Sequence, residues 1–180
     1  LFLLFRRTVD IGNLLRGKSV AVVGAADSAF NTGQGEYIDG FDVVIRVNKA
    51  PWVIKSGRWV NDIGSKTDIL FHSFFENESS GGGKIDLDIF DQLRIKHIVN
   101  PISDWSGYRV LLNFYKKYLA ARVTYSISRI EYKKIKSKLG KHKPTIGFCA
   151  LHSTLSSDFE ELFITGFTFF RTPFGAGYRD

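Results

Sequence analysis

The chain has 180 residues, of which 44% are hydrophobic, and a formal net charge of +7. A chain of this size can bury one proper core, so we expect a single domain over residues 1–180, and we leave open whether its C-terminus is truncated. The single cysteine, Cys149, excludes an internal disulfide, and the sequence shows no signal-peptide pattern. We therefore expect a cytoplasmic protein.

The first residues, Leu1 to Phe5, are apolar but too few to cross a bilayer. They predict either a helix that packs on the domain, which we favour, or the end of a truncated membrane anchor. The chain contains no methionine.

The segment from Lys18 to Pro51 predicts a βαβ unit. Ser19 to Val23 is a short apolar run typical of a strand buried on both faces, and Gly24 ends it. Asp27 and Ser28 are helix-capping residue types, so a helix should start there. Phe41 to Val47 then predicts a second buried strand. The loops at the carboxyl ends of such strands are where a nucleotide phosphate binds.

The glycines of this segment do not by themselves decide between a ligand site and a structural turn, because their spacing does not fit G-x-G-x-x-G. The whole pattern is more informative. Residues 22–51 resemble, without a gap, the large sialylmotif of the family 29 sialyltransferases. The shared positions are Val22, Val23, Gly24, Gly33, Gly35, Ile38, Asp39, Asp42, Val44, Arg46, Asn48, Ala50 and Pro51.

Two further segments extend the resemblance in the order that the family has. Gly64 to Thr67 (GSKT) is similar to the tetrapeptide that follows the large motif, and Pro144 to Gly147, with Gly166-Phe167, is similar to the small sialylmotif. The resemblance implies an α/β fold: one Rossmann-like domain with a mostly parallel twisted sheet and helices on both faces, the GT-A variant of sialyltransferases. It also implies an inverting, metal-independent transfer of sialic acid or a related acid sugar from a CMP donor to a glycan hydroxyl.

The resemblance also implies which residues hold the CMP part of the donor, which is a substrate, so that no cofactor is expected. At some of these positions the chain departs from the family: Ala25 and Ser28 replace asparagines, and Ile146 replaces a threonine. Backbone N–H groups could still hold a phosphate at the first turn. The implied donor-binding residues are Gly24, Ala25, Ser28, Asn48, Thr145, Ile146, Gly147, Gly166, Phe167 and Thr168.

Tyr178 is the implied catalytic residue. Tyr178-Arg179-Asp180 resembles the family's third motif, in which an aromatic residue hydrogen-bonds the leaving CMP phosphate. The histidine base of the family lies in a motif beyond this point, and no histidine of the chain matches it. The alternative function is therefore a CMP-binding protein without transferase activity, either a fragment or a pseudoenzyme. A third hypothesis is a basic adaptor for membranes or nucleic acid.

Between the motifs, Ala50 to Lys66 carries irregularly placed tryptophans and predicts a loop that folds over the site. Asp68 to His72 predicts the third strand. His72, at its carboxyl end, either approaches the donor or is a partly exposed polar residue, which is the more common case. Phe74 to Lys84 predicts a loop, with a lid as one interpretation. Asp86-Leu87-Asp88 spells a metal-binding D-x-D, but acidic residues also favour a helix start, which we prefer.

The last elements are a strand at Lys96 to Asn100, a helix at Tyr108 to Ala121, a helix opened by Thr145 and a buried strand at Leu162 to Phe167. From Arg109 to Lys143 there are eleven Lys or Arg and one acid, Glu131. Such a segment is expected to bind anions: an acidic glycan, a lipid head group or membrane leaflet, or nucleic acid. Nucleic acid is not expected, because no reading motif accompanies the charge, and plain solvated helix faces remain open.

Overall fold

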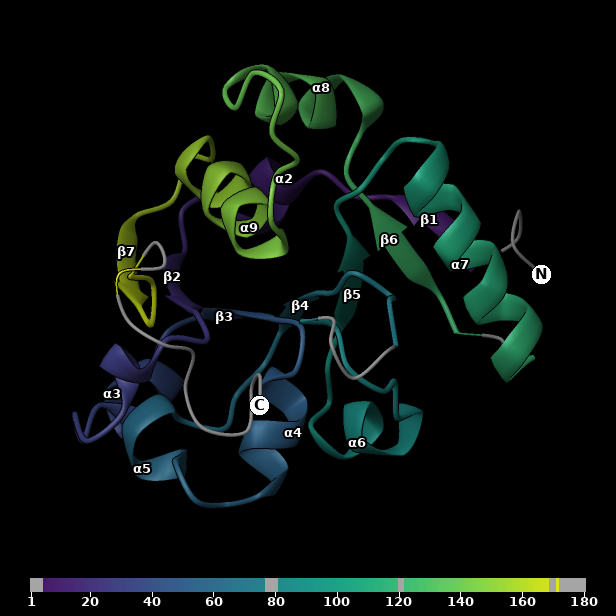
Figure 1. The fold of residues 1–180 in the computed structure, drawn as a ribbon. Coiled ribbons are helices and arrows are strands. Elements are labelled where there is room, and N and C mark those ends of the chain that lie inside the picture. Colours follow the sequence, from purple (N-terminus) through teal and green to yellow (C-terminus); the bar gives the residue numbers. More distant parts are fainter. Residues whose placement is uncertain (1–4, 77–80, 120–121, 169–170, 172–180) are drawn as a thin grey trace.

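The protein is an α/β domain built on one seven-stranded parallel sheet (Figure 1). The computed structural model describes residues 5–76, 81–119, 122–168 and 171. The strand order is β1-β6-β5-β4-β3-β2-β7, and every pair of neighbours is parallel. The strands are β1 (Arg6–Thr8), β2 (Ser19–Val23), β3 (Val43–Val47), β4 (Ile69–Phe71), β5 (His97–Asn100), β6 (Thr124–Ser126) and β7 (Glu161–Thr165). The predicted Rossmann-like architecture is confirmed.

The helices divide between the two faces of the sheet according to the direction in which the chain crosses it. From β2 to β6 the chain steps along the sheet one way, and from β1 to β2 and from β6 to β7 it crosses back. Right-handed crossovers in opposite directions place their helices on opposite faces. One face therefore carries α3 (Gly35–Asp39), α4 (Ala50–Lys55), α5 (Val60–Ile63), α6 (Leu87–Gln92) and α7 (Trp105–Tyr118), and the other carries α2 (Ile11–Leu15), α8 (Arg129–Ser137) and α9 (Ile146–Leu155).

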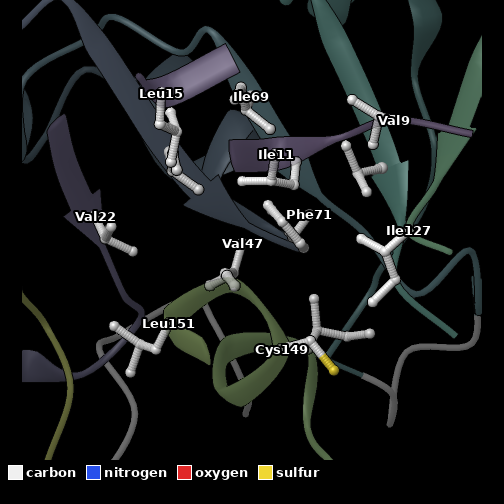
Figure 2. Packing of buried hydrophobic residues seen from close by; sticks show 14 of the residues in the cluster. Val9, Ile11, Leu15, Val22, Val47, Ile69, Phe71, Ile127, Cys149 and Leu151 are labelled. Carbon is white, nitrogen blue, oxygen red and sulfur yellow. The ribbon is translucent and has the colours of Figure 1, made fainter. Parts of the chain in front are cut away.

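Alternate residues of each central strand enter different cores. Val20 and Val22 of β2 pack under α2 and α9, whereas Ala21 and Val23 pack against α3. Figure 2 shows the first of these cores, with Phe71 and Leu151 among its members. This two-sided burial explains why the strands appear in the sequence as continuous apolar runs rather than alternating ones.

Cys149 is also part of this core. It is fully buried, and burial raises the pKa of its thiol to about 12. The thiol is therefore protonated at neutral pH and acts as a small packing group rather than as a nucleophile.

Two predicted elements between β2 and β4 differ from the structure. Ala50 to Lys66 forms the two short helices α4 and α5, not a loop, because Pro51 occupies the first turn of α4 and Trp59 precedes α5 as its N-cap. The chain after Gly24 makes only a 3-10 turn at Asp27–Ala29, and the first α-helix of the unit begins at Gly35.

The two ends of the sheet also differ from expectation. Of the predicted N-terminal helix, Leu1 to Leu4 lie outside the described part of the chain, and Phe5 is helical and packs against the core beneath α6 and α7. Arg6–Thr8 then form the edge strand β1, paired with β6, which the sequence did not predict. β7 was expected to be buried, but it is an edge strand, and Ile164 is 40% exposed. An edge strand has a neighbour on one side only, which a run of apolar letters cannot reveal.

Asp39, at the end of α3, binds the GSKT segment. Its carboxylate accepts hydrogen bonds from the backbone N–H groups of Ser65 (2.8 Å) and Lys66 (2.9 Å), and from the Ser65 hydroxyl. Gly64 has a left-handed φ of 70°, and a Cβ there would lie 2.2 Å from Asp39 Oδ1. The large motif and the GSKT segment are therefore in direct contact through a structural carboxylate.

Arg46 holds the same segment from inside the sheet. Its side chain is fully buried, Nε donates to Lys66 O (2.9 Å), Nη2 donates to Ile63 O (2.5 Å), and Nη2 lies 3.9 Å from Asp39 Oδ1. Burial lowers the pKa of this guanidinium to about 10, which still leaves it charged at neutral pH. The buried cation fixes the loop that follows α5.

We predict that Asp39→Ala lowers the free energy of unfolding by roughly 2 to 3 kcal/mol, because several backbone and hydroxyl donors lose a charged acceptor together. Urea unfolding followed by circular dichroism measures this change. Glu160→Ala, which removes an exposed carboxylate at another surface, is the control and should change the value by less than about 0.5 kcal/mol. Equal effects of the two substitutions would show that Asp39 does not stabilise the loop.

Candidate functional site

The loops that follow β2 and β7 touch each other at the carboxyl edge of the sheet. Gly24 N donates to Thr165 O (2.8 Å), and Ala26 N donates to Gly166 O (2.9 Å). A Cβ on Gly24 would lie 2.2 Å from Gly166 O, and Gly166 itself has a left-handed φ of 74°. This approach requires glycine at both positions. β2 is also the strand at which the chain reverses its direction across the sheet, where open parallel sheets bind ligands.

The start of α9 joins this contact. Thr145 caps the helix, and its hydroxyl accepts from Phe148 N (3.1 Å). A Cβ on Gly147 would lie 3.1 Å from the Phe167 ring, which also lies against Gly24. We call the set Gly24, Thr145, Gly147, Gly166 and Phe167 the candidate nucleotide site. It combines close backbone approach with a helix N-terminus, whose N–H groups and dipole favour a phosphate.

Asn48 lies at the same edge, at the end of the neighbouring strand β3. It has a left-handed φ of 48°, and its backbone N–H donates to Phe71 O (2.8 Å). Its side-chain Oδ1 accepts from Ser73 N (3.1 Å). The amide is thus oriented by the loop after β4, and Nδ2 is the atom with which it could donate to a ligand.

The remaining expected donor residues contribute less to this cluster. Ile146 has only 7% of its side chain exposed and packs in the core below α9, so that only its backbone could meet a ligand. Ala25 is half-buried beside Gly24, and Ser28 is exposed on the 3-10 turn. Thr168 follows Phe167 and is half-buried. Tyr178 lies outside the described residues.

His72 is a buried structural residue, whereas the sequence had suggested a partly exposed one. Its side chain is 1% exposed, Nδ1 accepts from Phe74 N (2.9 Å), and Nε2 therefore carries the proton and donates to Gly82 O (2.9 Å). Burial lowers the pKa of His72 to about 4. The neutral ring ties the end of β4 to the glycine-rich loop, and both of its nitrogens are occupied.

The same contacts bear on the predicted lid. Gly82 and Gly83 are buried, and a Cβ on Gly82 would lie 2.4 Å from Phe75 O. Glu76 is bound by Lys117 Nζ (3.0 Å) and by Ile85 N (3.2 Å). The described ends of this loop are therefore packed against the domain, and residues 77–80 lie outside the described part.

The D-x-D sequence begins a helix. Asp86 is the N-cap of α6, and its Oδ1 accepts from Ile89 N (3.1 Å), while Asp88 is exposed in the first turn. Within residues 5–76, 81–119, 122–168 and 171, no three His, Cys, Asp or Glu residues are grouped as metal ligands would be. The helix-capping interpretation of the pair agrees with these contacts.

The contacts that hold the loop between β2 and α3 could not be read from the sequence. Phe30 stacks on Trp59 with ring centroids 4.1 Å apart, and Asp62 accepts from Thr32 N and Gly33 N, each at 2.9 Å. These hydrogen bonds, foremost the one from Gly33, lower the pKa of Asp62. The tryptophan pattern indicated a contact near the site, but the partner of Trp59 could not be read from it.

An open groove of about 540 Å³ lies elsewhere. It follows α3 and reaches the first residues of β2 and β7, at the amino edge of the sheet, and is lined by Ser19, Gly33, Glu36, Tyr37, Gly40, Phe41 and Glu161. Because ligands of open parallel sheets bind at the carboxyl edge, we place the candidate site there and not in this groove.

Gly24→Ala should disrupt the candidate nucleotide site, because the new methyl group would overlap the Gly166 carbonyl. We expect the free energy of unfolding to fall by about 1 to 3 kcal/mol or more, as for other overpacked positions. Thermal unfolding measures it. Gly40→Ala is the matched control, since the nearest atom to its Cβ, Tyr37 O, is 3.3 Å away. Equal stability of the two variants would contradict the close contact.

His72 should make stability depend on pH. The folded pKa, about 4, lies below the value of 6.5 for a free histidine, so the unfolded chain binds the extra proton first as pH falls. The contribution is complete above pH 6.5 and is lost toward pH 4, by roughly 3 kcal/mol in total. Urea unfolding of wild type and His72→Gln between these pH values should show a smaller slope for the variant. His142→Gln, at an exposed position, should keep the wild-type slope; equal slopes for all three proteins would refute this role.

Comparisons with known proteins agree with this geometry. Residues 13–87 match the sequence model of glycosyltransferase family 29 (sialyltransferase), a range that includes β2, β3, β4 and the Asp39 contact with GSKT. A comparison with curated proteins gives no match. Residues 13–87 are therefore similar in sequence to glycosyltransferase family 29 (sialyltransferase).

Proposed function

We propose that the protein transfers sialic acid or a related acid sugar from a CMP-sugar donor to a glycan hydroxyl, with inversion at the transferred carbon. The observation that carries this proposal is the contact between Gly24 and Gly166. It brings the start of the large motif, the end of the small motif and the start of α9 to one point of the carboxyl edge. This is where a nucleotide phosphate is best stabilised in such a sheet.

In the proposed site, different groups of the chain bind different parts of the nucleotide. Backbone N–H groups at the start of α9 and the Thr145 hydroxyl face the phosphate or ribose, and the glycines allow the donor to approach the backbone. Asn48 Nδ2 is the proposed side-chain donor to the nucleotide, because its Oδ1 is already bound to Ser73 N. Ala25, Ser28, Ile146 and Thr168 contribute backbone or peripheral contacts.

The reaction forms a bond from the acceptor oxygen to the anomeric carbon and breaks the bond from that carbon to the CMP phosphate. The acceptor hydroxyl loses a proton to a base, and CMP leaves with the bonding electrons. The positive end of the α9 dipole stabilises the leaving phosphate, with Tyr178 as the proposed additional hydrogen-bond donor. A CMP donor carries one phosphate, so the proposal includes no metal and no cofactor.

Partners and location are part of the same proposal. The donor is CMP-sialic acid or a related CMP-sugar, the acceptor is a glycan or glycolipid, and the basic segment 109–143 contacts a membrane. The described residues contain no helix long and apolar enough to span a bilayer. We place the protein in a microbial cytoplasm, with the single cysteine as the supporting observation.

One observation favours a second candidate, a CMP-binding protein without transferase activity. His72 is the histidine closest in sequence to the large motif, and it is buried, neutral and bonded through both nitrogens. It is therefore not available as the base. This candidate keeps the nucleotide site and lacks the step that activates the acceptor.

We expect CMP to bind more tightly than UMP or UDP when each is titrated into the purified chain by calorimetry. Asn48→Asp keeps the acceptor for Ser73 N but replaces the amide donor with a negative oxygen, which repels a phosphate. CMP affinity should fall by about tenfold, the equivalent of roughly 1.4 kcal/mol.

Asn61→Asp makes the same change at an exposed position and should leave the affinity unchanged. Absence of binding, or equal binding of all three nucleotides, would remove the support for both candidates. CMP release from a CMP-sugar in the presence of glycan acceptors then separates them, because only the transferase gives a new glycoside.

A further inference from the structure

The positive charge of segment 109–143 is not evenly available at the surface. In the first part, two of the four basic residues are used within the domain: Lys117 pairs with Glu76 (3.0 Å) and Arg122 pairs with Asp91, whereas Arg109 and Lys116 are exposed. Arg122 Nη2 also donates to Ile95 O (3.2 Å). These contacts fasten α7 and the chain after it to α6 and the loop before it. The second part, residues 129–143, behaves differently.

We call residues 129–143 the α8 cationic segment. It holds seven basic residues and one acid, Glu131, whose carboxylate accepts a hydrogen bond from Ser153 of α9. All seven basic residues are exposed, and none of the ion pairs found among the described residues includes them. They are Arg129, Lys133, Lys134, Lys136, Lys138, Lys141 and Lys143.

The outer face of α8 carries one exposed apolar residue, near its first turn, beside its lysines. Tyr132 and Ile135 point into the core, which turns Ile130, Lys133 and Lys134 outward. Ile130 is 71% exposed. A helix stabilised only by solvation would not need an exposed isoleucine between lysines, but a helix that meets an apolar boundary would.

A second exposed apolar side chain stands beside this face. Trp105, the first residue of α7, is 78% exposed. Its neighbour Asp104 is close enough to Lys136 and Tyr132 for their charges to interact, and Ser103 donates to Ile127 O (2.5 Å) just before α8. Figure 1 shows the start of α7 on the side where α8 lies. The start of α7 therefore lies near Lys136 of α8, the helix that also carries Ile130.

We propose that this surface, made of the α8 cationic segment and Trp105, docks on the anionic leaflet of a membrane. The lysines bind lipid phosphates and carboxylates, Ile130 enters the head-group region, and Trp105 takes the interfacial position that its amphipathic ring favours. The proposal sharpens the contact expected for 109–143 by limiting it to the second part. It does not depend on CMP binding.

The combination of residues favours a membrane over nucleic acid. Both surfaces attract lysines, but the exposed side chains of Ile130 and Trp105 gain free energy by leaving water, which a membrane interface allows. Nucleic-acid surfaces that bind single strands pair basic residues with several stacking aromatics, and Trp105 is the one exposed tryptophan among the described residues.

The test is co-sedimentation of the purified chain with vesicles of phosphatidylcholine, with and without phosphatidylserine, at low and at physiological ionic strength. We expect binding to the anionic vesicles only, weaker at higher salt. Lys133→Ala with Lys134→Ala should reduce the partition coefficient roughly thirtyfold, since each basic residue near such a surface contributes about fivefold. Alanine is a good helix former, so α8 should persist.

Lys18→Ala with Lys55→Ala is the control, because it removes the same charge from exposed positions elsewhere. Trp105→Ala should weaken binding and abolish the blue shift of tryptophan emission that vesicles cause in the wild type. Equal losses in both double variants, equal binding to neutral vesicles, or preference for a duplex oligonucleotide over anionic vesicles would overturn the proposal. CMP affinity should be the same in all variants, so failure here is distinct from failure of the nucleotide site.

Discussion

The close approach of Gly24 to Gly166 is the constraint on which the rest of the structure depends. Two backbones can come this near only where neither carries a Cβ, and their contact joins the ends of β2 and β7. The crossover from β6 back to β7 places α9 on the opposite face from α3, and the N-terminus of α9 reaches the same point. The candidate nucleotide site follows from strand order and the absence of two side chains.

Several residues that the motifs share have structural rather than chemical roles. Asp39 binds the backbone of Ser65 and Lys66, Arg46 supports the same segment from the core, and a Cβ on Gly35 would lie 2.1 Å from Val60 O in α5. Part of the large motif therefore specifies packing contacts within the domain rather than contacts with a ligand. It brings Asn48 to the edge, and Asn48 is its one polar side chain that we assign to the donor.

Tertiary contacts also divide the basic residues into those that are paired within the domain and those that remain exposed. Lys117 and Arg122 are used to hold α7, whereas the basic residues of α8 and the chain after it remain exposed. A count of basic residues in the sequence treats all of them alike, because it gives the net charge but not the carboxylate with which each residue pairs. The functional meaning of the basic segment depends on which carboxylates lie near it, and those come from residues 76 and 91, far away in the chain.

The sequence by itself determined the parallel α/β class and the strands from β2 to β5, because two-sided burial leaves continuous apolar runs. The spacing of the motifs supplied the residues that we propose for the site. Only the tertiary structure decided that Ala50 to Lys66 forms helices, that β7 is an edge strand and that His72 is buried. Only the tertiary structure also showed that Lys117 and Arg122 are paired with carboxylates, whereas the basic residues of α8 are exposed. These properties depend on neighbours distant in the chain, and local periodicity holds no information about them.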